Sequence, residues 1–347
     1  MRYDPEQSYD WNFELGMGLG KNQLEAATPL AGADWRFCGL PVASPLGIAA
    51  GPLLNGGWVL HYANQGFDIL TYKTVRSRSR ACFAEPNLVP IVETEIAPGA
   101  HTSASKSMAG SWGISFGMPS REPDFWRRDI EDIRPKLGDG RLLVVSVVAS
   151  PEPDWTLEQV ADDYAQCACW AADAGADVIE LNLSCPNVAS QDGQLFRQPD
   201  KVSQILQRVF AFGCELPKVI KIGHLESESL IADLVQVCAT HQTAISMTNC
   251  LASTIEDENK EMLWGGESRG IGGEAIRKES IAQIRRFANA IRQQDVSTQL
   301  VGIGGISTAE HVDDYLAAGA NSVQLATSAM RSEDLGHRLK SRLQDKT

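Results

Sequence analysis

Eight apolar runs, separated by longer segments of helical period, constrain the fold of this 347-residue chain more than any other feature. Their apolarity is continuous rather than alternating, which is what a parallel strand covered on both faces requires. The runs are 45–51, 68–75, 142–150, 177–184, 218–223, 244–249, 299–305 and 322–327. Between the fourth and fifth runs, steps of three and four place one apolar set on a single helical face. That set is Val202, Ile205, Leu206, Val209 and Phe210.

Eight β/α units in one chain favour a closed barrel over a doubly wound sheet. The sequence therefore predicts the α/β class and a (β/α)8 TIM barrel over residues 36–347, with an N-terminal extension over 1–35. The segment 35–44 is interpreted as two short strands around Gly39 and Leu40, a β-hairpin that closes the bottom of the barrel.

Two long stretches, 76–135 and 250–275, interrupt the pattern after the second and sixth runs. Both would lie at the carboxyl ends of the strands, where barrels of this kind carry their chemistry. We expect them to be long loops on the catalytic face that act as lids or binding loops.

The formal net charge of −13 argues against a nucleic-acid partner or an anionic membrane, because either would need a basic face. No run of about 18 apolar residues occurs, and the first residues lack the pattern of a signal peptide. We expect a soluble, cytoplasmic protein. Cys167 and Cys169 have no second pair at metal spacing, so no metal site is expected.

The fourth run ends in a polar cluster, residues 182–187, where the barrel would open. Cys185 suits general-base work because an unperturbed thiol has a pKa of about 8.5, close to neutrality. Asn182 and Asn187 flank it and offer donors and acceptors to a planar amide or imide. The alternative is a loop whose asparagines cap its own backbone, with the cysteine as a small buried filler.

Lys73 in the second run and Lys221 in the fifth are lysines in apolar settings, where an unpaired ammonium is costly to bury. We expect both to point toward the mouth of the barrel and to hold negative charge on a ligand. The alternative for each is an ion pair with a carboxylate such as Glu180.

Glycines end the seventh run at Gly302, Gly304 and Gly305, and Ala326-Thr327 ends the eighth. In these barrels the loops after strands seven and eight bind phosphate through backbone N–H groups. A second cluster, 270–273, closes the long stretch after run six and is expected to complete that site. Each cluster taken alone is also compatible with a tight turn.

Together these motifs resemble the dihydroorotate dehydrogenase family over about residues 36–330. The segments that carry the resemblance are SPLGIAAG at 44–51, Lys73, ELNLSCPNV at 180–188, Lys221, Asn249, and the glycine-containing or VQxxT segments at 270–273, 302–306 and 323–327.

The resemblance implies a barrel that binds FMN and oxidises dihydroorotate to orotate, a step of pyrimidine biosynthesis. Cys185 would remove a proton while the adjacent carbon gives hydride to the flavin N5, and Lys73 would be the second catalytic residue. Soluble branches of the family carry cysteine at that position, so a soluble electron acceptor is expected. Barrels of this family often pair, so the resemblance also implies a homodimer. The residues implied in cofactor binding are Ala49, Ala50, Gly51, Lys73, Thr74, Lys221, Gly272, Gly273, Gly304, Gly305, Ala326 and Thr327.

The predicted substrate loop departs from the family. Where the family usually reads NSxGxPN, this chain has 114–120, with Ile114 and Ser120 in place of the two asparagines. Losing a buried polar partner typically costs about 1–3 kcal/mol, so a less polar substrate or a rearranged pocket is implied. Trp112 is expected to help line that pocket. The implied substrate residues are Asn182, Asn187, Asn249, Ile114, Phe116, Gly117 and Met118.

Two alternatives to dihydroorotate oxidation stay open from the sequence. One is a divergent flavoenzyme that dehydrogenates another small substrate in specialised metabolism, which the change at Ile114 motivates. The other is a barrel retained as a phosphate-binding or structural subunit without catalysis.

Overall fold

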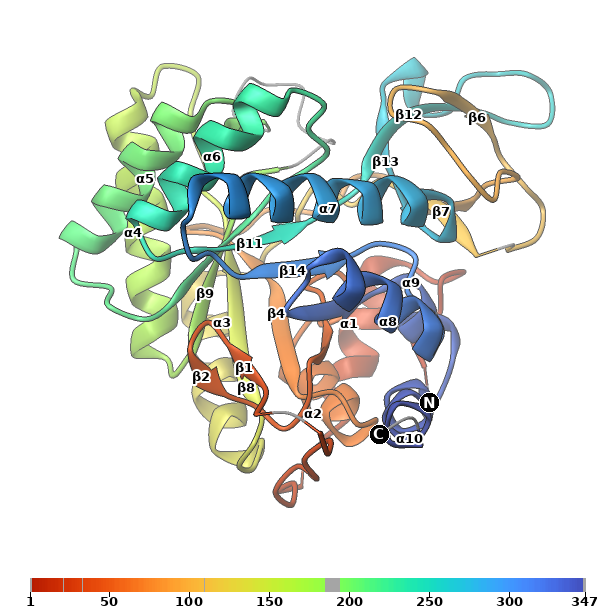
Figure 1. Cartoon of the computed structure of the whole chain (residues 1–347). Coiled ribbons are helices and arrows are strands. Elements are labelled where there is room, and N and C mark those ends of the chain that lie inside the picture. Colours follow the sequence, from red (N-terminus) through yellow and green to blue (C-terminus); the bar gives the residue numbers. More distant parts are fainter. Residues whose placement is uncertain (1, 21, 33, 109, 185–193, 346–347) are drawn as a thin grey trace.

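Eight parallel strands close into a barrel at the centre of the computed structural model, which describes residues 2–20, 22–32, 34–108, 110–184 and 194–345 (Figure 1). Around the barrel the order is β3, β4, β8, β9, β10, β11, β14, β15. Their bounds are β3 Leu46–Ile48, β4 Ile69–Val75, β8 Leu142–Val147, β9 Val178–Asn182, β10 Lys218–Lys221, β11 Ala244–Met247, β14 Leu300–Ile303 and β15 Ser322–Leu325. Each strand lies within one of the eight predicted runs, so the barrel prediction is confirmed.

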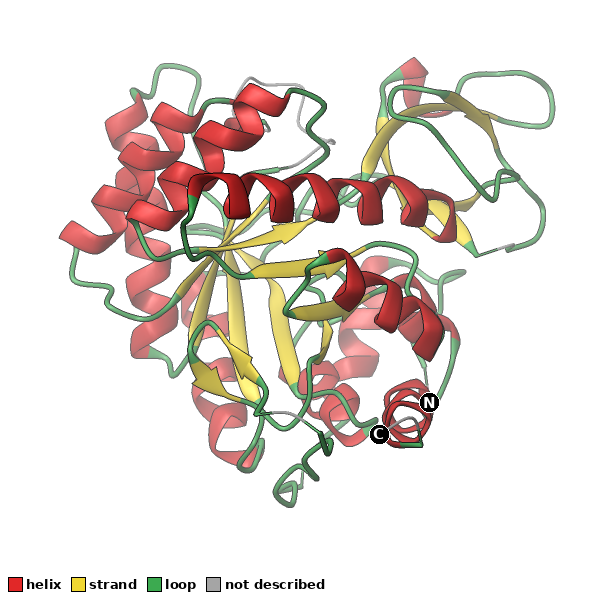
Figure 2. Cartoon of the chain, viewed as in Figure 1, coloured by secondary structure: helices red, strands yellow, loops and turns green. Residues whose placement is uncertain are grey.

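Helices surround the strands on the outside of the barrel (Figure 2). They are α2 Gly56–Asn64, α3 Pro123–Ile133, α4 Leu157–Asp173, α5 Pro199–Ala211, α6 Glu228–Thr240, α7 Arg277–Gln294, α8 Ala309–Ala318, α9 Thr327–Arg331 and α10 Leu335–Gln344. Short 3-10 turns are η1 Arg134–Lys136, η3 Leu195–Arg197, η4 Leu263–Gly266 and η5 Glu274–Ile276. Local sequence explains where helices begin. At the start of α4, the Thr156 side chain accepts a hydrogen bond from the backbone N–H of Gln159, and the Gln159 side chain accepts one from the backbone N–H of Thr156, which is a capping box.

The predicted apolar face of 202–210 is buried in α5, except at its last residue. Val202, Ile205, Leu206 and Val209 are buried, whereas Phe210 is 39% exposed. Its ring instead covers the ammonium of Lys218, which lies 3.7 Å from the ring centroid, and it stacks on His241. A cation–π contact at the rim of the barrel therefore replaces core packing at this position.

The predicted hairpin is present and closes the bottom of the barrel. β1 (Arg36–Phe37) and β2 (Leu40–Pro41) pair antiparallel, with Phe37 opposite Leu40. The turn is Cys38-Gly39, one residue earlier than predicted, because both residues have positive φ (51° and 83°), as a two-residue hairpin turn of this kind requires. Phe37 packs against residues that begin the strands, among them Ile69 and Val178.

The two interrupting stretches are not plain loops. They contribute β5 (Leu88–Pro90), β6 (His101–Ser103), β7 (Ser111–Ile114), β12 (Leu251–Glu256) and β13 (Arg269–Gly273). These form a second sheet in the order β5, β7, β13, β12, β6, which stands beside the barrel mouth at the upper right of Figure 1. The first stretch also contains α3, a regular barrel helix. The two stretches lie on the catalytic face, as predicted, but the sequence did not predict the strands inside them. Strand pairs such as Trp112 with Gly272 join segments too distant for local patterns to reveal.

The described part of residues 1–35 packs onto the barrel through α1 (Tyr9–Met17). Tyr3, Tyr9 and Phe13 are buried in the main core. The Asn55 side chain donates a hydrogen bond to the carbonyl of Phe13 (2.7 Å) and thereby ties α1 to the start of α2. The domain boundary at residue 36 stays a prediction. Across the described ranges, no helix is both long and apolar enough to cross a membrane.

Candidate active site

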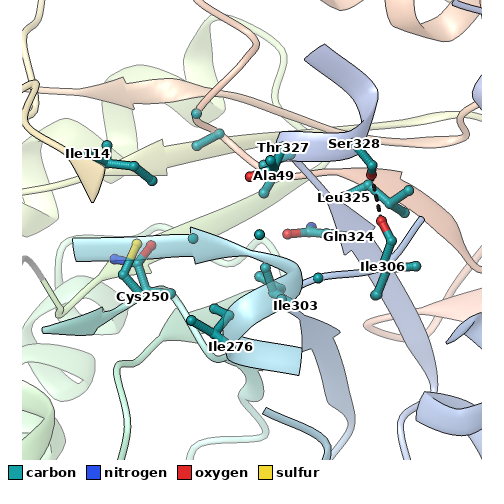
Figure 3. A pocket seen from close by; sticks show the side chains of 18 of the residues that line it. Ala49, Ile114, Cys250, Ile276, Ile303, Ile306, Gln324, Leu325, Thr327 and Ser328 are labelled. Carbon is teal, nitrogen blue, oxygen red and sulfur yellow. Dashed lines mark hydrogen bonds between the residues drawn. The ribbon is translucent and has the colours of Figure 1, made fainter. Parts of the chain in front are cut away.

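A cavity of about 320 Å³ opens where the carboxyl ends of the barrel strands meet the second sheet (Figure 3). All twelve predicted cofactor residues, from Ala49 to Thr327, line it. The described members of the predicted substrate set line it as well: Ile114, Phe116, Gly117, Met118, Asn182 and Asn249. Residues from seven barrel strands or the loops after them therefore converge on one space, although their individual roles stay predictions.

Lys73 and Lys221 reach the cavity from different strands. Lys73 lies on β4 and is 8% exposed, and Lys221 ends β10 and is 4% exposed. The Lys221 Nζ also lies 4.0 Å from Oε1 of Glu180, the ion pair that the sequence left as an alternative. The two interpretations of Lys221 do not exclude each other, because at this distance the ammonium keeps hydrogen-bonding capacity toward the cavity.

The two glycine clusters meet at one end of the cavity. Gly273, Gly304 and Gly305 have φ of 104°, 125° and 68°, a backbone region that L side chains rarely adopt. A Cβ at Gly305 would lie 2.8 Å from the carbonyl oxygen of Gly273, so the clusters touch. The Ser328 hydroxyl donates to the carbonyl of Ile306 (2.5 Å, dashed in Figure 3) and joins the β14 loop to α9.

The predicted substrate loop is held in an unusual backbone conformation at the end of β7. Ile114 points into the cavity in Figure 3, and the consecutive residues Gly117 and Met118 have φ of 74° and 54°. Buried Arg76 fastens this turn, since its Nε donates to the carbonyl of Met118 (3.1 Å) and its backbone N–H donates to Ser120 Oγ (3.1 Å). Ser120, at one position of the missing asparagines, thus stabilises the loop itself.

Asn182 is the last residue of β9, and Asn249, which follows β11, lies close to the loop after β9. The Asn182 Oδ1 accepts from the backbone N–H of Ser184 (3.2 Å), so this side chain caps its own loop and also lines the cavity. The Asn249 amide donates to the carbonyl of Ser184 (2.7 Å). Cys185 and Asn187, predicted as general base and substrate residue, lie outside the described residues. Ser184, directly before Cys185, is held by both asparagines.

Several residues that line the cavity were missed from the sequence. Tyr9 comes from α1, where no local pattern predicted a site residue; burial raises its pKa, so the phenol stays neutral. Gln324 lies in the VQxxT segment and donates to Thr71 Oγ1 (3.0 Å), and its position on a barrel strand was the available signal. The other missed residues include Cys250, Glu274, Ile303, Ser307 and Arg331.

Trp112 does not line this cavity, contrary to the expectation. It is 2% exposed and borders a neighbouring cavity together with Leu88 and Met108. Side chains two residues apart on a strand share a face, so Trp112 and Ile114 lie on the same side of β7. Trp112 packs into the main core there, whereas Ile114 reaches the cavity. Within the described ranges, no group of three or more His, Cys, Asp or Glu side chains is arranged to hold a metal ion.

Comparisons with known proteins agree on one family. The family model described as dihydroorotate dehydrogenase matches residues 129–346. A dihydroorotate dehydrogenase of Dictyostelium discoideum is 31% identical over 350 residues, which cover 94% of this chain and 93% of the relative. A dihydroorotate dehydrogenase (quinone) of Pseudomonas fluorescens is 24% identical and covers 93% and 90%. A probable dihydroorotate dehydrogenase A (fumarate) of Streptococcus pneumoniae is 27% identical and covers 62% and 65%.

Solved structures agree on the fold. The ligand-free dihydroorotate dehydrogenase of Eimeria tenella superposes with a TM-score of 0.74 at 18% identity, covering 98% of this chain and 94% of that one. The same enzyme in complex with ferulenol gives a TM-score of 0.75 at 17% identity and covers 98% and 91%. At 17–18% identity this similarity shows the barrel fold alone.

Proposed function

Because the chain belongs to the dihydroorotate dehydrogenase family, we propose that it is an FMN-dependent oxidoreductase that acts on a CH–CH bond and oxidises dihydroorotate to orotate. The observation that carries the proposal is the convergence of two buried lysines, two glycine clusters and two asparagines on one cavity. The sequence predicts a role in the same reaction for each of these groups.

The cavity residues fit FMN. Among the described residues, the side-chain oxygen Oε1 of Gln324 is buried without a hydrogen-bond partner, although the residue lines the cavity. A polar ring atom of a ligand would satisfy it. The phosphate would be held at Gly304, Gly305 and Thr327, where a glycine backbone admits close approach. Lys73 and Lys221 would hold the ring system between the strands.

FMN, when bound, supplies the acceptor for the hydride. Cys185 removes the proton from the neighbouring carbon, so that the substrate gains a double bond and the thiolate becomes a thiol. Asn182 and Asn249 present amide groups to the substrate ring, and Asn249 together with Asn182 also fixes the backbone just before Cys185. The backbone of Gly117 and Met118 faces the substrate carboxylate.

One observation favours a second candidate substrate. Ile114 places an aliphatic side chain in the cavity at a position where the family uses asparagine, and Phe116 and Met118 extend that apolar wall. A cyclic amide with a less polar substituent than a carboxylate would suit this wall. Such a substrate would use the same FMN, Lys73 and Cys185.

We also propose a soluble electron acceptor, a homodimer and a cytoplasmic location. Support for the acceptor comes from the relative named as fumarate-linked, whereas another relative is named as quinone-linked. Light scattering of the purified protein measures the dimer. Steady-state assays with fumarate and with a short-chain quinone compare the two acceptors.

The experiment that tests the function is anaerobic reduction of the purified holoprotein. We expect absorbance near ~450 nm from bound flavin, and loss of that absorbance on mixing with dihydroorotate. A flavin that dithionite reduces but dihydroorotate does not would contradict dihydroorotate as the substrate and favour the less polar cyclic amide. A protein purified without flavin, and unable to bind added FMN, would contradict the enzyme proposal and favour a barrel without catalysis.

A further inference from the structure

Glu180, in the middle of β9, places a carboxyl group inside the barrel. Its side chain is fully buried, and the residue lies in register with Ser146 on β8 and with Val219 on β10. Among the described residues, neither of its two carboxyl oxygens has a hydrogen-bond partner. Because an ionised carboxylate is strongly destabilised when it is buried alone, a nearby cation has to compensate it.

Lys221 supplies this cation. Its Nζ lies 4.0 Å from Oε1 of Glu180, an ion-pair distance that is longer than a hydrogen bond. Lys221 pairs with Asn182 on β9, so it lies one layer closer to the barrel mouth than Glu180. Lys221 also lines the cavity that is lined by the predicted cofactor residues. The ammonium is therefore shared between a carboxylate beneath it and the cavity above it.

We propose that Glu180 is a positioning residue that holds the Lys221 ammonium at the floor of the cavity and offsets part of its positive charge. This inference rests on the proposed function, because it concerns how Lys221 acts on bound FMN. Opposite charges about 4 Å apart interact much more strongly in a poorly hydrated interior than in water. Since the cofactor gains negative charge on reduction, the carboxylate lowers the reduction potential of bound FMN.

Neighbouring polar groups do not provide the same effect. Ser246, which pairs with Lys221 on β11, and Gln324 on β15 also have side-chain oxygens without hydrogen-bond partners among the described residues. Both are neutral, so they can accept a hydrogen bond from an ammonium but cannot offset its charge. The charge balance around Lys221 therefore depends on Glu180.

The test is the two-electron potential of the holoenzyme, measured anaerobically against a dye of known potential. Glu180→Gln removes the charge and keeps the size of the side chain. We expect the potential to rise by about 30 mV, a tenfold change in the equilibrium constant for reduction. Glu180→Asp keeps the charge and should restore most of the wild-type value. Ser322→Ala, which removes a buried hydroxyl outside the cavity, is the matched control and should leave the potential unchanged.

A double-mutant cycle tests whether Glu180 acts through Lys221. In a Lys221→Met background, Glu180→Gln should shift the potential by less than a third of the shift seen with Lys221 present. Some variants could bind FMN too weakly for potentiometry. For these the same cycle uses the dissociation constant of FMN, which is measured by quenching of flavin fluorescence. The combined effect of the two substitutions on this constant should differ by threefold or more from the product of their separate effects.

An unchanged or lowered potential in Glu180→Gln overturns the inference, and so does an equal shift with and without Lys221. Additive effects on FMN affinity overturn it as well. These failures leave the proposed function intact, because they are measured on protein that holds FMN. Failure of dihydroorotate to reduce the wild-type flavin would instead contradict the proposed substrate and leave the role of Glu180 standing.

Discussion

Ile114 is the residue that separates this chain most clearly from the usual substrate loop of its family. Its side chain points into the cavity, and its Cδ1 lies 3.0 Å from where a Cβ on Gly272 would stand. The wall between the loop and the second glycine cluster is therefore closely packed and apolar. A polar substrate group that faces Ile114 must leave its hydrogen bond to water unreplaced.

Ile114→Asn is expected to lower the KM for dihydroorotate by about fivefold, because one recovered hydrogen bond is worth about 1 kcal/mol. FMN content should not change. The measurement is steady-state kinetics, with Ile114→Val as the size-matched apolar control. A KM that is the same in both variants would show that residue 114 does not face the substrate.

Cys185→Ser should keep bound FMN but slow its reduction by dihydroorotate by about 10²- to 10⁴-fold at neutral pH, because a serine hydroxyl is a far weaker base than a thiolate. Stopped-flow absorbance of the flavin measures the reduction step. Cys250→Ser is the control, since this second thiol also lines the cavity but has no proposed role. Equal rates for wild type and Cys185→Ser would remove the base assignment.

At the scale of elements, α1 and α2 are joined by one buried amide. The Asn55 Oδ1 accepts from the backbone N–H of Trp58 (3.3 Å) and caps α2, while its Nδ2 donates to the carbonyl of Phe13 (2.7 Å) on α1. Trp58 adds a bond from its indole N–H to the carbonyl of Asn12 (2.8 Å). These contacts hold α1, and with it Tyr9, against the cavity.

Asn55→Ala removes both bonds and leaves a buried carbonyl unsatisfied, so we expect a loss of about 2–3 kcal/mol in the free energy of unfolding. Urea titration followed by tryptophan fluorescence measures it. Thr156→Ala, which removes only the cap of α4, is the comparison and should cost about 1 kcal/mol. Equal losses in the two variants would show that the bond to α1 contributes little.

The whole molecule should lose stability in mild acid because of His224. Burial and the neighbouring Arg286, whose Nη2 lies 3.1 Å from its Nε2, lower the pKa of His224 to about 4. Arg197 acts in the same direction, whereas Glu226 opposes it. Glu279 also faces the ring, with its Oε2 3.8 Å from Nε2. In the unfolded chain the pKa returns to about 6.5, so between pH 6.5 and 4 the unfolded state binds a proton that the folded state does not.

Stability should therefore fall as the pH drops through this window, by about 2 kcal/mol from this group between pH 7 and pH 5. His61 and His241, whose pKa burial also lowers, contribute in the same direction. Urea unfolding at both pH values measures the effect. His224→Gln should remove this share of the pH dependence, and His337→Gln, on the exposed face of α10, should not. A pH dependence unchanged by His224→Gln would contradict the assignment.

The sequence alone determined the barrel and most of the cavity. Continuous apolar runs specify strands buried on both faces, and in a parallel barrel all their carboxyl ends lie on one side. That geometry is why the sequence predicts one shared site for Lys73, Lys221 and the glycines of the last two loops. The end of the barrel at which these residues lie follows from the direction of each strand, and that direction is given by the order of residues in the chain.

Only the tertiary structure decided what covers that site. The second sheet depends on pairs such as His101 with Thr254, which lie far apart in the chain and have no local signature. Tyr9 lines the cavity because α1 docks on α2 through Asn55, whereas Trp112 is covered by packing beside Leu88 and Met108 and does not reach it. The proximity of Lys221 to Glu180 likewise depends on the register between β9 and β10. Such contacts arise from packing between distant segments, so the periodicity of a single segment does not contain them.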